Sequence, residues 1–198
     1  MIRILALAIA AYLIGSLPSA YVVVRLFRGT DLRTVESGSV GALNAFRATG
    51  AGWVGVVVLL LDVAKGMLAV ILAGDGAGLA TLALVTALAV AGHNWPIWLG
   101  GKGGKGLATS AGALTLITPL SVPLWGVVWG LTYVLSGYVA LATIVATAVL
   151  PFALGLFAGW PYGLCVLPTA LLILARHREK MRRLLLGAEP KHYWRAKL

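Results

Sequence analysis

The sequence predicts an all-α protein: a single membrane-embedded helical bundle over residues 1–198, with about seven transmembrane helices. Hydrophobic residues make up 60% of the chain and charged residues only 11%, whereas about a quarter of a typical soluble domain is charged. From Gly106 to Ala175, 70 consecutive residues include no Asp, Glu, Lys, Arg or His. An uncharged stretch of that length is expected only where the chain lies in a bilayer.

The first three transmembrane helices follow from uncharged runs near the N-terminus. Residues 4–24 contain no charge over 21 residues, and Pro18 suits a signal-peptide cleavage site poorly, so we predict a first span that is retained. We expect a second span from about Gly52 to Leu72, a turn at Gly74–Gly76, and a third span from about Leu79 to Ala91.

Proline and glycine divide the long uncharged stretch into four segments. The breaks are Thr118-Pro119 with Pro123, Ser136-Gly137, and Gly159-Trp160-Pro161. These residue types interrupt helices. The segments near Leu107–Ile117 and Pro123–Leu135 are shorter than the ~20 residues that a span usually needs. We therefore expect these two helices to be tilted, or to thin the bilayer locally.

Positive charge predicts the orientation. Three segments are basic: residues 25–47 with four arginines, the loop with Lys102 and Lys105, and the tail 176–198 with eight Lys or Arg residues. By the positive-inside rule all three face the cytoplasm, so the uncharged stretch must cross the bilayer an even number of times. This gives seven spans, with the N-terminus outside and the C-terminus in the cytoplasm. A five-span alternative, in which residues 107–135 form one bent helix, would place the basic tail outside.

The charge distribution and the cysteine content argue against other classes of protein. A net charge of +10 is common in nucleic-acid-binding proteins, but here the basic residues lie where a cytoplasmic membrane surface needs them. The single cysteine, Cys165, lies in an apolar run, which excludes a disulfide framework or a cysteine metal cluster. The histidines lack the spacing of a metal site. We therefore predict no metal, no cofactor and no nucleic-acid partner.

Residues 100–106, Gly-Gly-Lys-Gly-Gly-Lys-Gly, are the first candidate for a binding site. Glycines let the backbone approach an anion closely, two ammonium groups add positive charge, and a helix expected near Leu107 would direct its positive end at the loop. The pattern also matches Gly-x-Gly-x-x-Gly, but the chain lacks the βαβ unit of a dinucleotide site. A Walker A loop is excluded because Gly106 stands where Ser or Thr is required. The alternative is a flexible basic surface loop.

The segment 36–47 is the second candidate. It offers two hydroxyls, small residues, the amide of Asn44 and the guanidinium of Arg47, and arginine binds phosphate as a planar fork. Ser37 lacks the Gly-x-Ser-x-Gly setting of a hydrolase nucleophile. The alternative is a helix-capping turn, followed by an arginine that extends to the membrane surface.

Other polar and aromatic residues have more than one interpretation. Asp62 and Lys65 share a helix face; ionisable residues at membrane depth are often functional, and a structural ion pair is an equal alternative. His93 and His177 are suited to moving a proton near neutral pH, whereas His192 is expected to be solvated. The tryptophans expected to anchor the helices at the membrane surface are Trp95, Trp98, Trp125, Trp129 and Trp160.

Six motifs, taken in order, indicate a family. They are Gly15-Ser-Leu-Pro-Ser-Ala-Tyr21, the segment from Asp31-Leu-Arg33 to Arg47, Asp62-Val-Ala-Lys65-Gly66, Gly92-His-Asn-Trp-Pro96, Gly101-Lys-Gly-Gly-Lys-Gly-Leu-Ala-Thr109 and Arg176-His-Arg-Glu179. Over nearly the whole chain they resemble the bacterial acyl-phosphate-dependent glycerol-3-phosphate acyltransferases, the PlsY family. The resemblance implies seven spans in the bacterial cytoplasmic membrane and a site that faces the cytoplasm. It also implies acyl transfer from a fatty acyl phosphate to the 1-hydroxyl of glycerol 3-phosphate, without a metal, to give lysophosphatidic acid.

The same resemblance implies the site residues. The family's catalytic polar positions correspond to Ser37, Arg47, Lys105 and His177. The family's substrate-binding and phosphate-binding positions correspond to Gly38, Gly41, Asn44, Gly101, Lys102, Gly103, Gly104, Gly106 and Thr143. Because an acyl phosphate is already activated, no covalent nucleophile is needed, and binding, orientation and charge stabilisation supply the acceleration.

Several positions depart from the family pattern. Glu36, Ser39 and Leu43 stand where Gly, Asn and Thr are usual, Ala140 replaces a serine, and Lys180 replaces an asparagine. We hypothesise that Glu36 pairs with Lys180 and reshapes the acceptor site. Because of these departures, two alternative interpretations remain: an enzyme that uses another acceptor, and a non-catalytic lipid-binding protein. A transporter of a phosphorylated metabolite is a further alternative, and it should show inverted repeats or a second gate.

Overall fold

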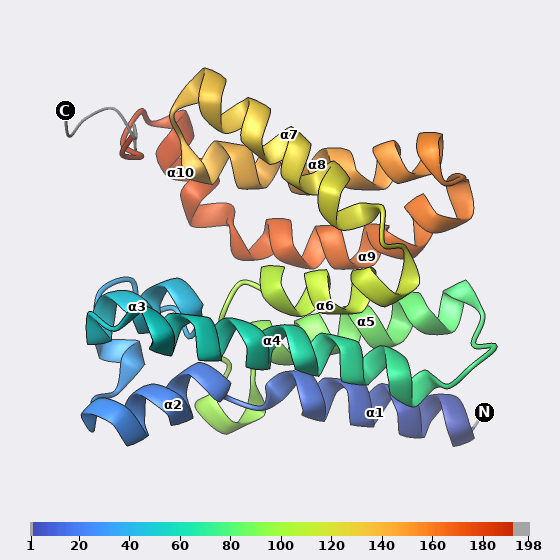
Figure 1. The fold of residues 1–198 in the computed structure, drawn as a ribbon, viewed down its shortest axis with the longest axis horizontal. Coiled ribbons are helices and arrows are strands. Elements are labelled where there is room, and N and C mark those ends of the chain that lie inside the picture. The colour runs from blue at the N-terminus through green and yellow to red at the C-terminus, as the bar shows by residue number, and fades with distance from the viewer. Residues whose placement is uncertain (1, 192–198) are drawn as a thin grey trace. The chain divides into compact units, whose positions relative to one another are not determined.

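The computed structural model describes residues 2–191, and every regular element in that range is helical (Figure 1). The chain divides into two compact units, Met1–Ile117 and Thr118–Leu198. The first unit contains α1 (Ile2–Ser16), α2 (Ser19–Arg28), the short 3₁₀ helix η1 (Leu32–Thr34), α3 (Ala42–Thr49), α4 (Gly52–Ala73), α5 (Leu79–Asn94), the 3₁₀ helix η2 (Ile97–Leu99) and α6 (Leu107–Ile117). The second contains α7 (Ser121–Ser136), α8 (Val139–Phe157), α9 (Trp160–Arg176) and α10 (Arg178–Leu185). Over the described residues the predicted all-α class is confirmed.

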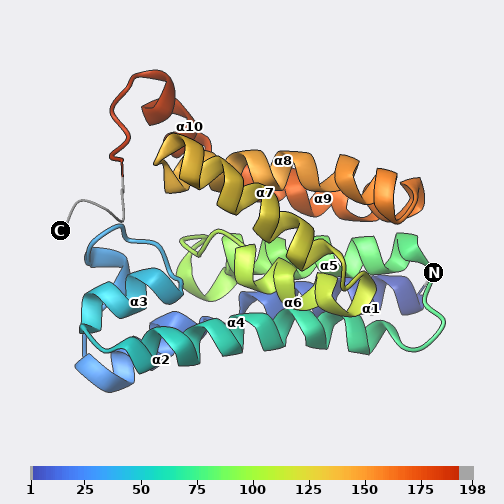
Figure 2. The ribbon, with the colours of Figure 1, turned by 45° about the horizontal axis from the view of Figure 1, so that its top comes forward.

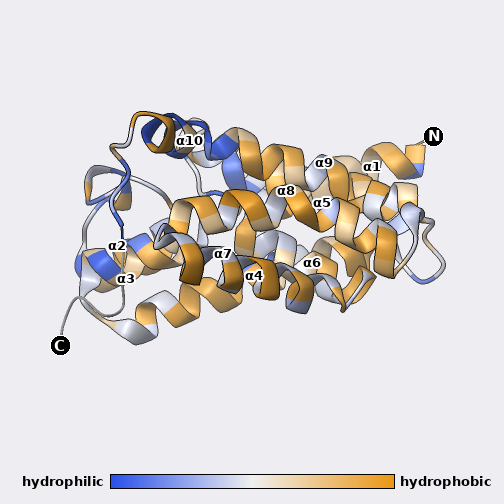
Figure 3. Ribbon diagram, turned by 90° about the horizontal axis from the view of Figure 1, so that it is seen from above, coloured by the Kyte–Doolittle hydropathy of each residue, from blue (hydrophilic) through white to orange (hydrophobic). Residues whose placement is uncertain are grey.

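Four helical stretches of the described chain are long and apolar enough to cross a membrane. They are Ile2–Arg28, Gly52–Ala73, Leu79–Leu99 and Val139–Phe157. The apolar helices α6, α7 and α9 are shorter. Figure 3 shows hydrophobic residues along the lengths of the helices and hydrophilic residues concentrated on α10. These features are typical of an integral membrane protein, because lipid-facing helices must be apolar around most of their surface.

The predicted helix boundaries agree with the structure at four places. Helices are interrupted at residues 74–78, 118–120, 137–138 and 158–159, where the turn and the three proline–glycine breaks were expected. The third span continues three residues beyond the predicted end at Ala91. The sequence therefore determines most boundaries locally, through residues that end helices.

The expected first span is interrupted in the structure. α1 ends at Ser16 and α2 begins at Ser19, because Pro18 lacks an N–H group and its ring disrupts the preceding turn. The ammonium of Lys65 in α4 donates to the carbonyl oxygen of Leu17 at 3.1 Å. This bond gives a polar partner to a backbone group that the break releases.

Small residues let the long helices of the first unit pack closely. α4 lies beside α6, and α1 lies beside α5 (Figures 1 and 2). A Cβ atom on Gly66 of α4 or on Gly112 of α6 would overlap a backbone carbonyl of the other helix, and Gly15 of α1 and Gly92 of α5 meet each other's helices in the same way. Close backbone contact at small residues is the usual basis of helix packing in membranes.

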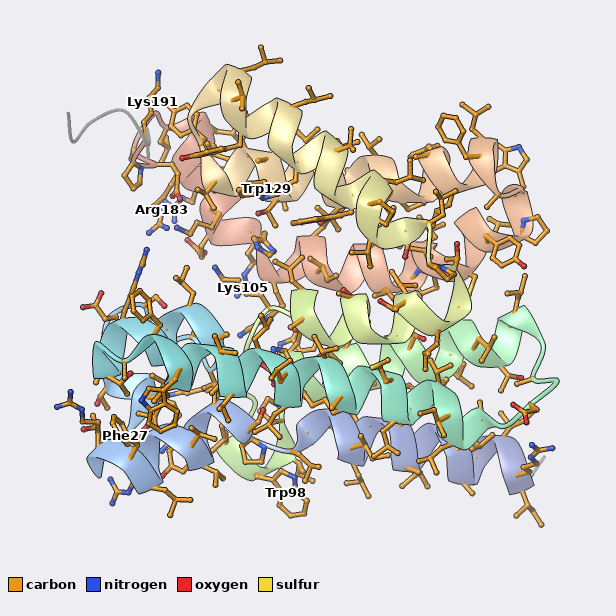
Figure 4. All side chains as sticks on the ribbon, viewed as in Figure 1. Phe27, Trp98, Lys105, Trp129, Arg183 and Lys191 are labelled. Carbon is orange, nitrogen blue, oxygen red and sulfur yellow. The ribbon has the colours of Figure 1, made fainter. Side chains whose placement is uncertain are left out.

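In the second unit, tryptophans join α7 to α8. The indole N–H of Trp125 donates to the Thr147 hydroxyl at 3.2 Å, and that of Trp129, labelled in Figure 4, donates to the Thr143 hydroxyl at 3.1 Å. Trp125, Trp129 and Tyr133 also stack successively along α7. We expected both tryptophans only as anchors at the membrane surface, and the structure assigns them to the contact between two helices.

Candidate functional site

The glycine-rich loop 100–106 is built against the end of α5. Gly100, Gly101 and Gly106 have φ angles of 58°, 78° and 83°, a left-handed conformation that glycine adopts without strain. A Cβ atom on Gly103 would overlap the carbonyl oxygen of His93, and the N–H group of Gly104 donates to that same oxygen at 3.0 Å. The loop is thus tied to the protein core, which argues against the alternative of a flexible surface loop.

The two candidate segments lie side by side. The N–H group of Val40, in the segment 36–47, donates to the carbonyl oxygen of Gly103 at 3.3 Å. A Cβ atom on Gly104 would come within 2.8 Å of the carbonyl oxygen of Val40. Residues about 60 positions apart in the chain are therefore in direct contact in the first unit, and the segments that contain Ser37, Arg47 and Lys105 meet at this point.

Two helices begin at this surface. α6 begins at Leu107 after Gly106, as expected, and α3 begins at Ala42 after Gly41. The N-cap of α3 has no side-chain hydrogen bond. The first N–H groups of a helix lack intrahelical partners and carry partial positive charge, so helix N-termini favour anions.

Several backbone N–H groups of the glycine-rich loop donate to carbonyl oxygens of the protein itself. The N–H groups of Gly101 and Lys102 donate to the carbonyl oxygens of Pro96 at 3.0 Å and Leu99 at 3.2 Å, and Gly104 donates to His93. These three amides fold the loop, and the expectation that its glycines surround a phosphate stays a prediction. The first N–H groups of α3 and α6 have no intrahelical acceptor and are the backbone donors best suited to an anion.

The Asn44 side chain forms hydrogen bonds within its own loop. Its amide nitrogen donates to the carbonyl oxygens of Leu32 at 3.2 Å and Val35 at 3.3 Å, and its oxygen accepts from the N–H of Ser37 at 3.3 Å. The side chain is only 4% exposed. Asn44 therefore shapes the loop that presents Ser37, which is exposed, and its predicted contact with a substrate stays a prediction.

The arginines of the segment 25–47 differ in their partners. Arg25 and Arg28 donate to the carbonyl oxygens at the C-terminal ends of α2 and α3, each at 2.6 Å. Arg33 forms a fork on Asp31 with a shortest distance of 2.6 Å, and these hydrogen bonds lower the pKa of Asp31 to about 2. Within the described residues, Arg47 makes no side-chain hydrogen bond or ion pair and is exposed. Arg47 is thus the arginine of this segment that is available for an anion.

His177 and Thr143 belong to the second unit. His177 lies between α9 and α10, is buried, and its Nδ1 lies 2.8 Å from the carbonyl oxygen of Ile173. A hydrogen bond to a carbonyl requires a proton on Nδ1, so in the neutral ring Nε2 is the basic nitrogen. The Thr143 hydroxyl donates to Val139 at 2.9 Å and accepts from Trp129. The Thr143 hydroxyl thus links α7 to α8, and its predicted contact with a substrate stays a prediction.

Lys180 has a partner that we did not expect. The ammonium of Lys180 donates to Glu189 Oε1 at 2.6 Å, and Arg183 donates to Glu189 Oε2 at 2.7 Å, so these three residues form a triad within the C-terminal region. Glu36 belongs to the other unit, and its pairing with Lys180 stays a hypothesis. Arg183 and Lys191 are labelled in Figure 4. His192, expected to be solvated, lies outside the described residues.

Asp62 and Lys65 lie on one helix face, as predicted, and form a buried ion pair at 2.8 Å. Ser19 donates to the same carboxylate oxygen at 2.6 Å, and His93 Nδ1 lies 3.6 Å from it. Sequence reasoning identified the pair but missed Ser19 and the position of His93 beside the glycine-rich loop. The only local feature that could have indicated Ser19 is its position directly after Pro18, which breaks the helix.

Known proteins resemble this chain over most of its length. Residues 5–187 match the family model for glycerol-3-phosphate acyltransferase. Glycerol-3-phosphate acyltransferase 2 of Moorella thermoacetica is 44% identical over 184 residues, which cover 92% of this chain and 94% of that protein. The corresponding protein of Desulforudis audaxviator is 40% identical over 187 residues, with 93% of each chain covered.

Solved structures agree with these relatives. The crystal structure of PlsY, an integral membrane glycerol 3-phosphate acyltransferase, in its glycerol 3-phosphate form matches with a TM-score of 0.85 and 37% identity, and covers 96% of each chain. The lysophosphatidic acid form matches with a TM-score of 0.82 and 35% identity, covering 95% of this chain and 94% of that one. By sequence and by fold, this chain belongs to the glycerol-3-phosphate acyltransferase family of integral membrane enzymes.

Proposed function

We propose that this protein transfers a fatty acyl group from an acyl phosphate to the 1-hydroxyl of glycerol 3-phosphate. The products are lysophosphatidic acid and inorganic phosphate. The related PlsY structures hold glycerol 3-phosphate in one form and lysophosphatidic acid in the other, an acceptor and its acylated product. The observation that supports the proposal best is the hydrogen bond between Val40 and Gly103, because it unites two basic, glycine-containing segments into one surface suited to phosphate.

In the transfer step one bond forms and one breaks. The 1-hydroxyl oxygen bonds to the acyl carbon, and the bond from that carbon to the phosphate oxygen breaks. The hydroxyl proton passes to the departing phosphate, which is itself a base. Neither substrate requires a covalent intermediate on the enzyme, so the protein has to bind two anionic substrates, align them and stabilise the charge on the leaving group.

In this proposal the site residues have separate roles. Arg47 and Lys105 bind phosphate oxygens as charged donors, and the first N–H groups of α6 add the positive end of a helix. Ser37 contributes a hydroxyl from the loop that Asn44 holds. A catalytic role for His177, which belongs to the second unit, stays a prediction from the family resemblance.

The proposal includes a topology. Seven spans in the bacterial cytoplasmic membrane, with the N-terminus outside, would place the three basic segments and the site in the cytoplasm. The four long apolar stretches and the three shorter apolar helices are consistent with this number. Fatty acyl phosphate would then enter from the lipid, and glycerol 3-phosphate from the cytoplasm.

The proposal is tested with purified protein in lipid nanodiscs. Palmitoyl phosphate and glycerol 3-phosphate are added, and phosphate release and lysophosphatidic acid are measured together. We expect the two products in equal amounts. Dihydroxyacetone phosphate and glycerol, tested as acceptors, and palmitoyl-CoA, tested as donor, define the specificity.

The control is the Lys105→Ala variant, prepared in the same way. Equal activity with palmitoyl-CoA would contradict the acyl phosphate donor. Faster transfer to dihydroxyacetone phosphate than to glycerol 3-phosphate would contradict the proposed acceptor and favour an enzyme with another one.

A further inference from the structure

A buried polar cluster lies beside the glycine-rich loop. We call Ser19, Asp62, Lys65 and His93 the Asp62 cluster. All three groups that surround the carboxylate face the same oxygen, Oδ1: the Ser19 hydroxyl at 2.6 Å, the Lys65 ammonium at 2.8 Å and His93 Nδ1 at 3.6 Å. Asp62, Lys65 and His93 are only 2%, 6% and 7% exposed, so the cluster is removed from water.

Stability alone is a weak explanation for this cluster. A buried ion pair must overcome the desolvation of both charges, and replacing one by well-packed apolar residues is often neutral or stabilising. The cluster also joins distant parts of the first unit, because Ser19 belongs to α2, Asp62 to α4 and His93 to α5. Lys65 extends it to the helix break at Leu17. A small cavity at this point is lined by Lys65, His93, Val40 and Gly103, so the cluster reaches both loops of the candidate site.

His93 connects the cluster to the loop in two ways. Its Nδ1 edge faces Asp62. Its opposite edge packs against the loop so closely that a Cβ atom on Gly104 would overlap Nε2. The carbonyl oxygen of His93 also accepts the N–H of Gly104 at 3.0 Å. Ring and backbone of one residue therefore fix the position of Gly104, and Lys105 is the next residue in the chain.

We propose that the Asp62 cluster positions the glycine-rich loop, and that His93 is the residue through which it acts on Lys105. His93 and Asp62 are positioning residues in this proposal, since both are buried and act through Lys105. The proposal rests on the proposed role of Lys105 as a phosphate-binding residue. Its physical basis is that a displacement of about 1 Å in a group that orients a substrate can reduce a rate by about a hundredfold.

The test compares His93→Asn with Lys105→Ala and with the double variant. The asparagine amide can still reach Asp62, but the ring edge that packs against Gly104 is lost. Full kinetics are measured for both substrates in nanodiscs, with thermal unfolding as a measure of folding. Thr86→Val is the matched control, because Thr86 lies seven residues earlier on the same face of α5, is buried, and has a hydroxyl without a hydrogen-bond partner in the described structure.

We expect His93→Asn to raise the KM of the same substrate whose KM rises in Lys105→Ala, by about tenfold, with a smaller change in kcat. The double variant should resemble Lys105→Ala alone, because the loop position no longer matters once the ammonium is absent. Thr86→Val should match the wild type. If His93→Asn does not fold, Ser19→Ala, which removes one hydrogen bond from Asp62, should produce the same KM change at smaller size.

Two results would overturn the inference. The first is a double variant whose change in KM equals the product of the changes in the two single variants. This result would mean that His93 acts independently of Lys105. The other is unchanged KM values in a folded His93→Asn or Ser19→Ala variant. If Lys105→Ala itself leaves both KM values and kcat unchanged, the proposed role of Lys105 fails first, which separates the failure of the function from the failure of the inference.

Discussion

The backbone of Val40 is hydrogen-bonded to the backbone of Gly103, with 3.3 Å between the donor nitrogen and the acceptor oxygen. This contact joins a loop that precedes α3 to a loop that precedes α6. Each loop contains glycines and leads into a helix N-terminus, so the contact concentrates donors and positive charge at one place. Four predictions follow from this site and from its surroundings.

Removing the charge of Arg47 or Lys105 should weaken catalysis strongly. A charge-assisted hydrogen bond contributes roughly 1.5–3 kcal/mol, so Arg47→Ala and Lys105→Ala should each lower kcat/KM by about tenfold to over a hundredfold. Phosphate release from palmitoyl phosphate is the measurement. Arg25→Ala is the matched control, because Arg25 donates only to the end of its own helix. Wild-type turnover in both variants would remove these residues from the site.

Cysteine labelling should place the basic segments on one side of the membrane. In a Cys165→Ser background, cysteines at Arg33, Lys102 and Arg183 should react with an impermeant reagent only from the cytoplasmic side. A cysteine at Asp75 should react only from outside. The native Cys165 is buried, so thermal unfolding of the Cys165→Ser protein is first compared with that of the wild type. Labelling of Lys102 and Arg183 from opposite sides would contradict the seven-span topology.

Replacing Glu36 should stabilise the protein. Glu36 has a φ angle of 52°, the only positive φ of a non-glycine residue in the described chain. A side chain in this left-handed conformation costs about 1 kcal/mol, which glycine avoids and asparagine tolerates. Glu36→Gly and Glu36→Asn should therefore raise Tm by a few degrees. Thermal unfolding in detergent measures the change.

The control for that prediction is Glu36→Ala, which removes the same carboxylate but keeps a Cβ atom. A rise in Tm for Glu36→Ala equal to that for Glu36→Gly would assign the effect to charge. The backbone explanation would then be wrong.

The contacts of Glu189 should make the C-terminal region sensitive to acid. Burial alone would raise the pKa of Glu189, but hydrogen bonds from Lys180 and Arg183 outweigh it, so the pKa is lowered. A group with a lowered folded pKa contributes stability above its unfolded pKa, ordinarily about 4.3, and loses it as the pH falls through the folded value. Hydrogen exchange in residues 184–191, corrected for its intrinsic pH dependence, should therefore accelerate as the pH falls below the unfolded pKa and through the lower folded pKa of Glu189.

The Glu189→Gln variant separates this contact from general acid effects. Exchange in 184–191 should already be fast at pH 7 and should not accelerate further in acid. Glu179→Gln changes an exposed carboxylate of α10, the helix that carries Lys180 and Arg183, and should behave like the wild type. Slow exchange at pH 7 in Glu189→Gln would show that the ion pairs do not hold this segment.

The sequence by itself determined the helical class, most helix boundaries and the two segments of the candidate site. Uncharged runs and proline–glycine breaks are local signals, because the bilayer requires apolar helices and because proline and glycine act on their own turn. The break at Pro18 has the same local cause. It was missed because the uncharged run continues past it and sequence reasoning treated that run as one span.

The tertiary structure alone decided which polar groups form hydrogen bonds within the protein. Asn44, Thr143 and the amides of Gly101, Lys102 and Gly104 matched substrate-binding positions, yet each is engaged in folding its own loop or helix pair. For Lys180 we expected Glu36 as the partner, and the structure shows an ion pair with Glu189. Sequence specifies which donors and acceptors exist, whereas their partners depend on distances between residues far apart in the chain. Only the folded backbone sets those distances, as it does between Asp62, His93 and Gly104.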